Sequence, residues 1–222
     1  MTEHTNHYYY SFEQEGNFSY SAEDIDQLSE THRHSATNEL YALLTIQSEP
    51  LSTIAIDMMK RSQNLFAESI YRRLGFSFND SSSAIVAQVL ADWGIQRNRA
   101  IVVDGSGLSR YNYLTASALT DVLVRLYRNE SNQTFFLATL PIANEDGTLR
   151  NRFRGTASAG NARAKTGSMS HVRALAGYVK TADGEQLAFT ILANNFSANP
   201  TDVVNAIDAF VSALATMSRG DS

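Results

Sequence analysis

The stretch Arg163-Ala-Lys-Thr-Gly-Ser-Met169 and the two segments after it, Arg173-Ala-Leu-Ala-Gly-Tyr-Val-Lys180 and Gln186-Leu-Ala-Phe-Thr-Ile-Leu-Ala193, decide the fold. Short, mostly apolar segments separated by turn residues predict strands, and Asp183-Gly184 is a dipeptide that closes hairpins. We therefore predict three consecutive antiparallel strands. Gly167, inside the first strand, indicates a place where another backbone comes close.

Composition limits the classes of protein to consider. A chain of 222 residues with 43% hydrophobic and 18% charged residues is typical of a single globular domain with a sizeable core. The formal net charge is −5 and no long basic run occurs, which argues against a nucleic acid partner. Cysteine is absent, which excludes disulfides and Cys-based zinc sites. No apolar run reaches the roughly 18 residues of a membrane span.

Residues 1–38 differ from the rest of the chain, because they hold four of the five histidines and the run Tyr8-Tyr9-Tyr10. We expect a leader that is either disordered or folded back, as a strand near Tyr8–Tyr20, over the edge of the Gln186 strand. Its first residues have neither the cationic nor the apolar region of a signal peptide. His32-x-His34 is interpreted as a solvated pair, and nothing in the chain indicates a metal or a cofactor.

The segment from Leu51 to Leu74 has the apolar spacing of a helix. On a continuous helix, Ser62 and Asn64 would point about 200° apart. If both serve one site, the helix must break between them, with Asn64 capping the second half and Gly75 ending it. Further helices are predicted over about 81–93, 115–127, 135–140 and 148–153. A last helix from Thr201 is predicted to cover one face of the sheet through Val204, Ile207, Phe210, Val211 and Leu214.

The loop Asp104-Gly-Ser-Gly-Leu-Ser-Arg110 is rich in turn residues. We interpret it as structural, with Asp104 accepting backbone N–H bonds. It is not a nucleophile elbow, because Asp104 stands two residues before Ser106, where that motif needs glycine. His171 is interpreted as a strand residue beside the site.

Three motifs in this order resemble the C-terminal half of the D-alanyl-D-alanine carboxypeptidase/endopeptidase family, the class C low-molecular-mass penicillin-binding proteins. They are Ser62-Gln-Asn64, the Asp104–Arg110 loop and Lys165-Thr-Gly167, the last a signature of serine penicillin-binding proteins and β-lactamases. Leu140-Pro-Ile-Ala143 with Asp146-Gly-Thr-Leu149 adds to the resemblance. It implies that residues 39–218 are the C-terminal part of an α/β domain of the β-lactamase/penicillin-binding transpeptidase-like fold, an antiparallel sheet flanked by helices.

The resemblance also implies acyl transfer through a serine, with peptidoglycan stem peptides or β-lactams as ligands and a periplasmic or cell-envelope location. Ser62 would relay a proton to the leaving amine. Asn64 would hold a substrate amide. Lys165 would supply positive charge beside Ser62 and toward the substrate's terminal carboxylate.

The resemblance assigns substrate binding to the residues after Lys165. The hydroxyls of Thr166 and Ser168 would bind the terminal carboxylate, and the N–H of Ser168 would form half of an oxyanion hole. The peptide would lie along the strand as an added strand, where Gly167 leaves room for it.

The family's nucleophile motif, Ser-x-x-Lys, is absent from these 222 residues, because the three lysines are preceded at that distance by Asp57, Ala162 and Gly177. We therefore expect the family's upstream part, with the nucleophile, to be missing and the chain by itself not to turn over substrate. One alternative is a non-catalytic remnant that binds peptide termini or a protein partner. Another is a β-lactamase, which the Asp104–Arg110 loop disfavours.

Overall fold

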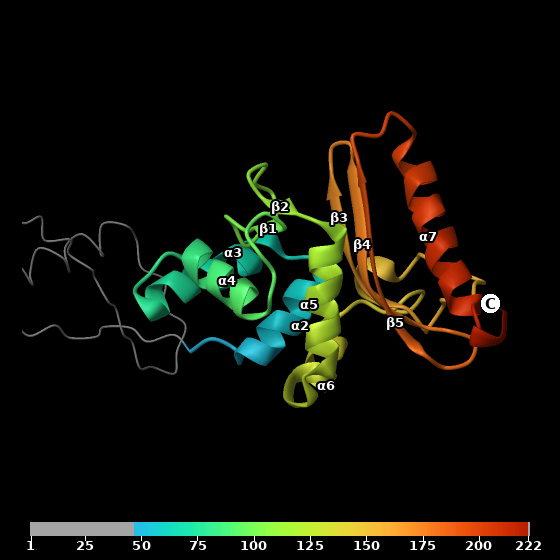
Figure 1. Ribbon diagram of the computed structural model, residues 1–222, viewed down its shortest axis with the longest axis horizontal. Helices are drawn as coiled ribbons and strands as arrows, with labels where there is room; N and C mark the ends of the chain where they lie inside the picture. The colour runs from blue at the N-terminus through green and yellow to red at the C-terminus, as the bar shows by residue number, and fades with distance from the viewer. Residues whose placement is uncertain (1–46, 222) are drawn as a thin grey trace, which may run out of the picture. The chain divides into compact units, whose positions relative to one another are not determined.

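A computed structural model describes residues 47–221 of the chain (Figure 1). The chain divides into two units, Met1–Glu49 and Pro50–Ser222, and the second is described here by itself. The expected leader over residues 1–38, with its strand and its histidine pair, lies outside the described residues. Within residues 47–221, no helix is long and apolar enough to cross a bilayer.

The second unit is built on a three-stranded antiparallel sheet in the order β3-β4-β5. Its strands are β3 (Arg163–Met169), β4 (Val172–Lys180) and β5 (Gln186–Asn194). The three predicted strands are thereby confirmed, with Lys165 on an edge strand and the Gln186 strand on the other side. His171 lies in the β3–β4 turn with a positive φ of 57°, so its interpretation as a strand residue is wrong.

Side chains of β4 alternate between two hydrophobic cores, as the period of two in a strand requires. Leu175 and Val179 face the core under α7 (Pro200–Thr216), and Ala176 and Tyr178 face the core on the other side. Helices α2 (Leu51–Arg61), α5 (Ala116–Arg128) and α6 (Glu130–Thr139) cover that second side (Figure 1). The prediction of a sheet flanked by helices is confirmed.

Helix α7 docks on the sheet as predicted, but not through all of the residues expected. Ile207, Val211 and Ala215 are its buried residues, whereas Phe210 is 56% exposed. Ala215 lies eight residues after Ile207, with Val211 halfway between them, so these three share one stripe of the helix, and Phe210 lies beside that stripe.

The helices before the sheet begin largely where the sequence predicts. Ser81 caps α4 (Ser82–Asp92) and Thr115 caps α5, each accepting from the backbone N–H three residues ahead. The helix α3 (Asn64–Phe78) does not stop at Gly75 but continues to a left-handed cap at Asn79. A Cβ at Gly75 would lie 2.7 Å from the Asp80 carbonyl oxygen, so this glycine is needed for close packing rather than as a cap.

Two short strands and two short turns complete the unit. The strands β1 (Ala100–Ile101) and β2 (Tyr113–Leu114) pair with each other and enclose the Asp104 loop. The helix α6 begins at Glu130, five residues before the predicted start, because the side chain of Asn129 caps it there. The helix predicted over 148–153 is only the short turn η2 (Gly147–Leu149), and a second short turn, η3 (Arg219–Asp221), follows α7.

The hydroxyl of Tyr178 ties α5 to β4, because it is buried and donates to the Leu123 carbonyl at 2.7 Å. We expect Tyr178→Phe to lower the free energy of unfolding by about 1 kcal/mol, since the carbonyl loses a buried partner. Urea unfolding measures the change. Tyr111→Phe is the control, because Tyr111 is 84% exposed. Equal losses in the two variants would contradict this account of Tyr178.

Candidate active site

A break between two helices places Ser62. The helix α2 ends at Arg61, and Ser62 takes up a left-handed conformation with φ 59° and ψ 51°. Its N–H and that of Gln63 both bond to the Met58 carbonyl, which closes the helix end. The predicted break is confirmed. Asn64, however, is the first residue of α3 rather than its cap, and Gln63 occupies the cap position without a side-chain bond.

Lys165 reaches from β3 to this break. Its Nζ lies 2.6 Å from Ser62 Oγ and 2.8 Å from the Thr166 carbonyl oxygen, and it donates to both. Burial lowers the pKa of Lys165, because an ammonium loses hydration in this position. The expected approach of Ser62 to Lys165, across 103 residues of sequence, is confirmed.

Among residues 47–221, backbone pairing to the outer edge of β3 is confined to the beginning of the strand. The Ala164 N–H donates to the Pro141 carbonyl at 3.0 Å, and Ile142 bridges to Arg163. Alternate residues of a strand direct their backbone groups to the same edge. The N–H and C=O groups of Thr166 and Ser168 therefore point outward beyond the covered part, next to Lys165.

The side chains after Lys165 differ in their surroundings. The Thr166 hydroxyl donates to the hydroxyl of Thr148, in η2, at 3.0 Å, while Ser168 is exposed. At Gly167 a Cβ would lie 3.2 Å from the Cβ of Ala174, so a side chain would crowd the sheet there. The structure thus brings Ser62, Lys165 and Thr166 to one edge of β3.

No hydrogen bond ties Asn64 to this group within residues 47–221. Although it is only two positions after Ser62, it is exposed and forms no side-chain hydrogen bond within the part of the chain that the structure describes. Its assignment to substrate binding stays a prediction. Among residues 47–221, no group of three or more histidine, aspartate or glutamate side chains comes together as a metal site would require.

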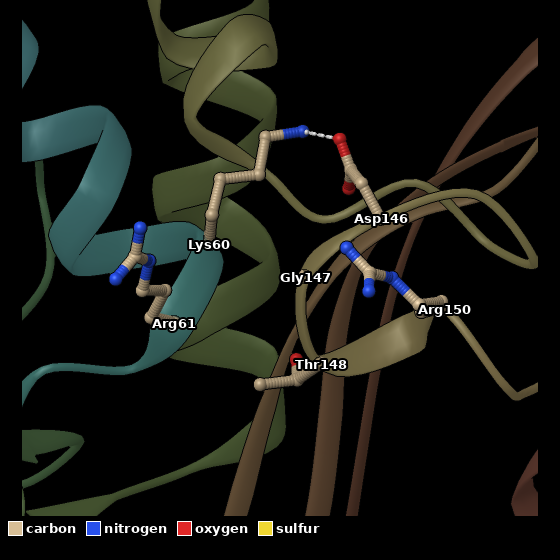
Figure 2. Close-up of a pocket in the computed structure, with 6 residues that line it drawn as sticks. All are labelled: Lys60, Arg61, Asp146, Gly147, Thr148 and Arg150. Atoms are coloured by element: carbon tan, nitrogen blue, oxygen red, sulfur yellow. Dashed lines mark hydrogen bonds and ion pairs between the residues drawn. The ribbon is translucent and has the colours of Figure 1, made fainter.

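A pocket beside Thr166 was missed by the sequence reasoning. It is lined by Lys60, Arg61, Asp146, Gly147, Thr148 and Arg150 (Figure 2). Lys60 forms an ion pair with Asp146 across the pocket's rim. The sequence signal was present, since Asp146-Gly-Thr-Leu149 contributes to the family resemblance and Lys60 stands two residues before Ser62, but neither pattern reveals that the two segments meet.

The Asp104 loop has the structural role that was predicted. The carboxylate accepts from the N–H groups of Gly107 and Ser109 at 2.9 and 2.8 Å, and from the Asn112 amide at 2.7 Å. Burial by itself would raise the pKa of Asp104, but the hydrogen bonds from Asn112, Ser109 and Gly107 outweigh it, so the pKa lies below its ordinary value.

Comparison with known proteins identifies the family. The profile of the D-Ala-D-Ala carboxypeptidase 3 (S13) family matches residues 22–217. The chain belongs to this family. Among S13 relatives, the D-alanyl-D-alanine carboxypeptidase of Actinomadura sp. (strain R39) is 40% identical over 171 residues, which are 72% of this chain and 31% of that protein.

Solved structures agree with the S13 assignment. Penicillin binding protein 4 (dacB) from Haemophilus influenzae superposes with a TM-score of 0.72 and 30% identity, over 81% of this chain and 43% of that one. The TLA-3 extended-spectrum β-lactamase, 20% identical with a TM-score of 0.58 over 74% of this chain and 62% of its own, shares the fold. The predicted fold class and family are confirmed. The chain spans about a third of the length of the first curated relatives it matches, 35% and 31%.

We expect the ammonium of Lys165 to titrate below the ordinary lysine value of about 10.4. Its pKa is lowered in the folded chain, so the unfolded chain holds this proton at higher pH. Between the two pKa values the contribution of this group to stability therefore rises with pH. Labelling with [13Cε]lysine measures it, since the chain has only three lysines, and Lys165→Arg assigns the signal. A midpoint at or above the ordinary value would contradict the burial argument.

Proposed function

We propose that this chain carries the proton-relay and carboxylate-binding part of a serine-type D-alanyl-D-alanine carboxypeptidase/endopeptidase that acts on peptidoglycan stem peptides. The observation that carries the proposal is the 2.6 Å approach of Lys165 Nζ to Ser62 Oγ beside the outer edge of β3. A lysine whose pKa is lowered by burial can pass a proton through an adjacent hydroxyl more readily than an ordinary lysine. Ser62 then delivers that proton to the leaving amine.

The substrate lies along the outer edge of β3 as an added strand. The outward N–H and C=O groups of Thr166 and Ser168 support this placement. The two hydroxyls bind the terminal carboxylate, the Ser168 N–H polarises the scissile carbonyl, and Asn64 holds a substrate amide. A β-lactam occupies the same position, and penicillin binding protein 4 from H. influenzae has been solved with one bound.

The charges of the pocket that Thr148 helps to line bear on which peptides fit. Arg61 is paired with Asp57, while Arg150 forms no ion pair within residues 47–221. The pocket is thus locally cationic in a chain whose net charge is −5. We infer that acidic groups on the stem peptide are favoured here, and that the protein works where peptidoglycan is, in the periplasm or cell envelope.

We also infer that these 222 residues bind the peptide but do not acylate, because they contain no serine three residues before a lysine. In the family, that serine attacks the carbonyl and its lysine helps remove the proton. The same sequence feature favours the second candidate function, a non-catalytic domain that binds peptide termini.

Peptide binding is tested by NMR with a peptide that ends in D-Ala-D-Ala. We expect shifts in the β3 amides, and about ten- to a hundredfold weaker binding by Thr166→Val, since a hydrogen bond to a charged group is lost. Thr216→Val is the matched control, because Thr216 is exposed at the end of α7. A peptide whose terminal carboxylate is replaced by an amide should bind the unchanged protein as weakly as the carboxylate peptide binds Thr166→Val. If the β3 amides do not respond, the binding proposal is wrong.

Turnover is tested by covalent labelling with fluorescent penicillin and by release of D-alanine. We expect neither from the purified 222-residue chain, because proton relay without a nucleophile cannot break the peptide bond. Hydrolysis that disappears on Ser62→Ala would contradict the inferred inactivity and make Ser62 the first candidate for the nucleophile. Labelling that survives Ser62→Ala would locate the nucleophile elsewhere in the chain.

A further inference from the structure

The loop between α6 and β3 stands between the two halves of the site. Ser62 follows α2, and Lys165 belongs to β3, 103 residues later. On one side, Pro141 and Ile142 of this loop pair with the start of β3. On the other side, its turn η2 contacts the end of α2. The distance between Ser62 and Lys165 therefore depends on how this loop holds both neighbours.

The carboxylate of Asp146 contacts both sides, the segment next to β3 and the end of α2. Asp146 Oδ1 accepts from the Ile142 N–H at 2.7 Å, and Ile142 is the residue that bridges to Arg163 of β3. Asp146 Oδ2 accepts from Lys60 Nζ at 2.5 Å, two residues before Ser62 (Figure 2). The Lys60 side chain is only 17% exposed and that of Asp146 37% exposed. The pair is thus partly shielded from water and salt, unlike an exposed surface ion pair.

A backbone contact strengthens the same junction, which is the contact between the end of α2 and the loop before β3. A Cβ at Gly147 would lie 2.6 Å from the carbonyl oxygen of Lys60 and 3.1 Å from Pro141 Cβ. The last turn of α2 therefore rests directly on the backbone of η2, which only glycine permits there. Lys60 is held twice, through its side chain and through its carbonyl.

We propose that Lys60 and Asp146 are positioning residues that keep Ser62 against Lys165. The path of contacts runs from Ser62 along α2 to Lys60, across the ion pair to Asp146, through Ile142 to β3 and so to Lys165. This inference rests on the proposed function of Ser62 and Lys165, but its test needs no substrate. A peptide that fails to bind therefore leaves this test unaffected.

The test is the titration of Lys165, followed by [13Cε]lysine NMR in Lys60→Met and Asp146→Asn. When the junction opens, water reaches Lys165 and the desolvation that lowers its pKa is relieved. We expect the proton affinity of Lys165 to rise about threefold or more in both variants. Lys60→Arg should keep the original midpoint, since a guanidinium also pairs with the carboxylate.

Direct electrostatics predicts a different result. Removing the Lys60 cation would raise the proton affinity of Lys165, whereas removing the Asp146 anion would lower it. Only the loss of positioning moves both variants in the same direction. A shift in opposite directions, or no shift in either variant, would overturn the proposal.

The matched control is Arg152→Met. Arg152 pairs with Asp208 of α7, and their side chains are 17% and 18% exposed, so this ion pair is more shielded than the first and belongs to the other face of the sheet. Urea unfolding should show that Lys60→Met, Asp146→Asn and Arg152→Met all lose stability. Only the first two should change the titration midpoint of Lys165. An equal shift in Arg152→Met would mean that the effect is general destabilisation.

A milder variant covers the case in which Lys60→Met or Asp146→Asn does not fold. Asp146→Glu keeps the charge but adds one methylene, so its carboxylate cannot reach Ile142 and Lys60 with the original geometry. The proton affinity of Lys165 should rise in this variant as well. An unchanged midpoint in folded Asp146→Glu, with both hydrogen bonds lost, would overturn the proposal.

Discussion

Strand β4 must be covered on both faces and paired along both edges, and the rest of the unit follows from this constraint. Its residues from Leu175 to Val179 are all buried. Apolar side chains on two faces require two separate helical layers, which α7 supplies on one side and α5 with its neighbours on the other. Pairing on both edges then makes β3 an edge strand, and the candidate active site lies along its outer edge.

The site depends on a lysine that is kept partly out of water. An ammonium in such a position gives up hydration, and the hydroxyl of Ser62 and the carbonyl of Thr166 replace only part of it. The arrangement is maintained by contacts outside the site, above all the junction between α2 and the loop before β3. A lysine in this condition gives up its proton more easily, which suits the proton relay proposed for it.

The comparison with relatives shows how much of the family's domain this chain contains. The match to penicillin binding protein 4 from H. influenzae covers most of this chain but less than half of the other one. The described residues contain the helix break at Ser62 and, later in the chain, the Lys165 strand, but no Ser-x-x-Lys motif. Binding and acylation are therefore separable questions for this polypeptide.

The sequence by itself determined the elements whose causes lie within a few residues. Ser81 and Thr115 cap their helices by accepting from the backbone N–H three residues ahead. The apolar strand segments, with Asp183-Gly184 between the last two, establish the hairpins. The order of the three motifs was sufficient to indicate the family and the meeting of Ser62 with Lys165.

Only the tertiary structure decided the contacts between distant segments. Lys60 and Asp146 are 86 positions apart, and no sequence pattern pairs them, because their approach depends on the packing of η2 against α2. The exposure of Phe210 and the extension of α3 past Gly75 were missed for the same reason. An apolar stripe does not fix which of its residues are buried, and a glycine does not fix whether a helix ends there. The neighbouring segments that pack against them decide both.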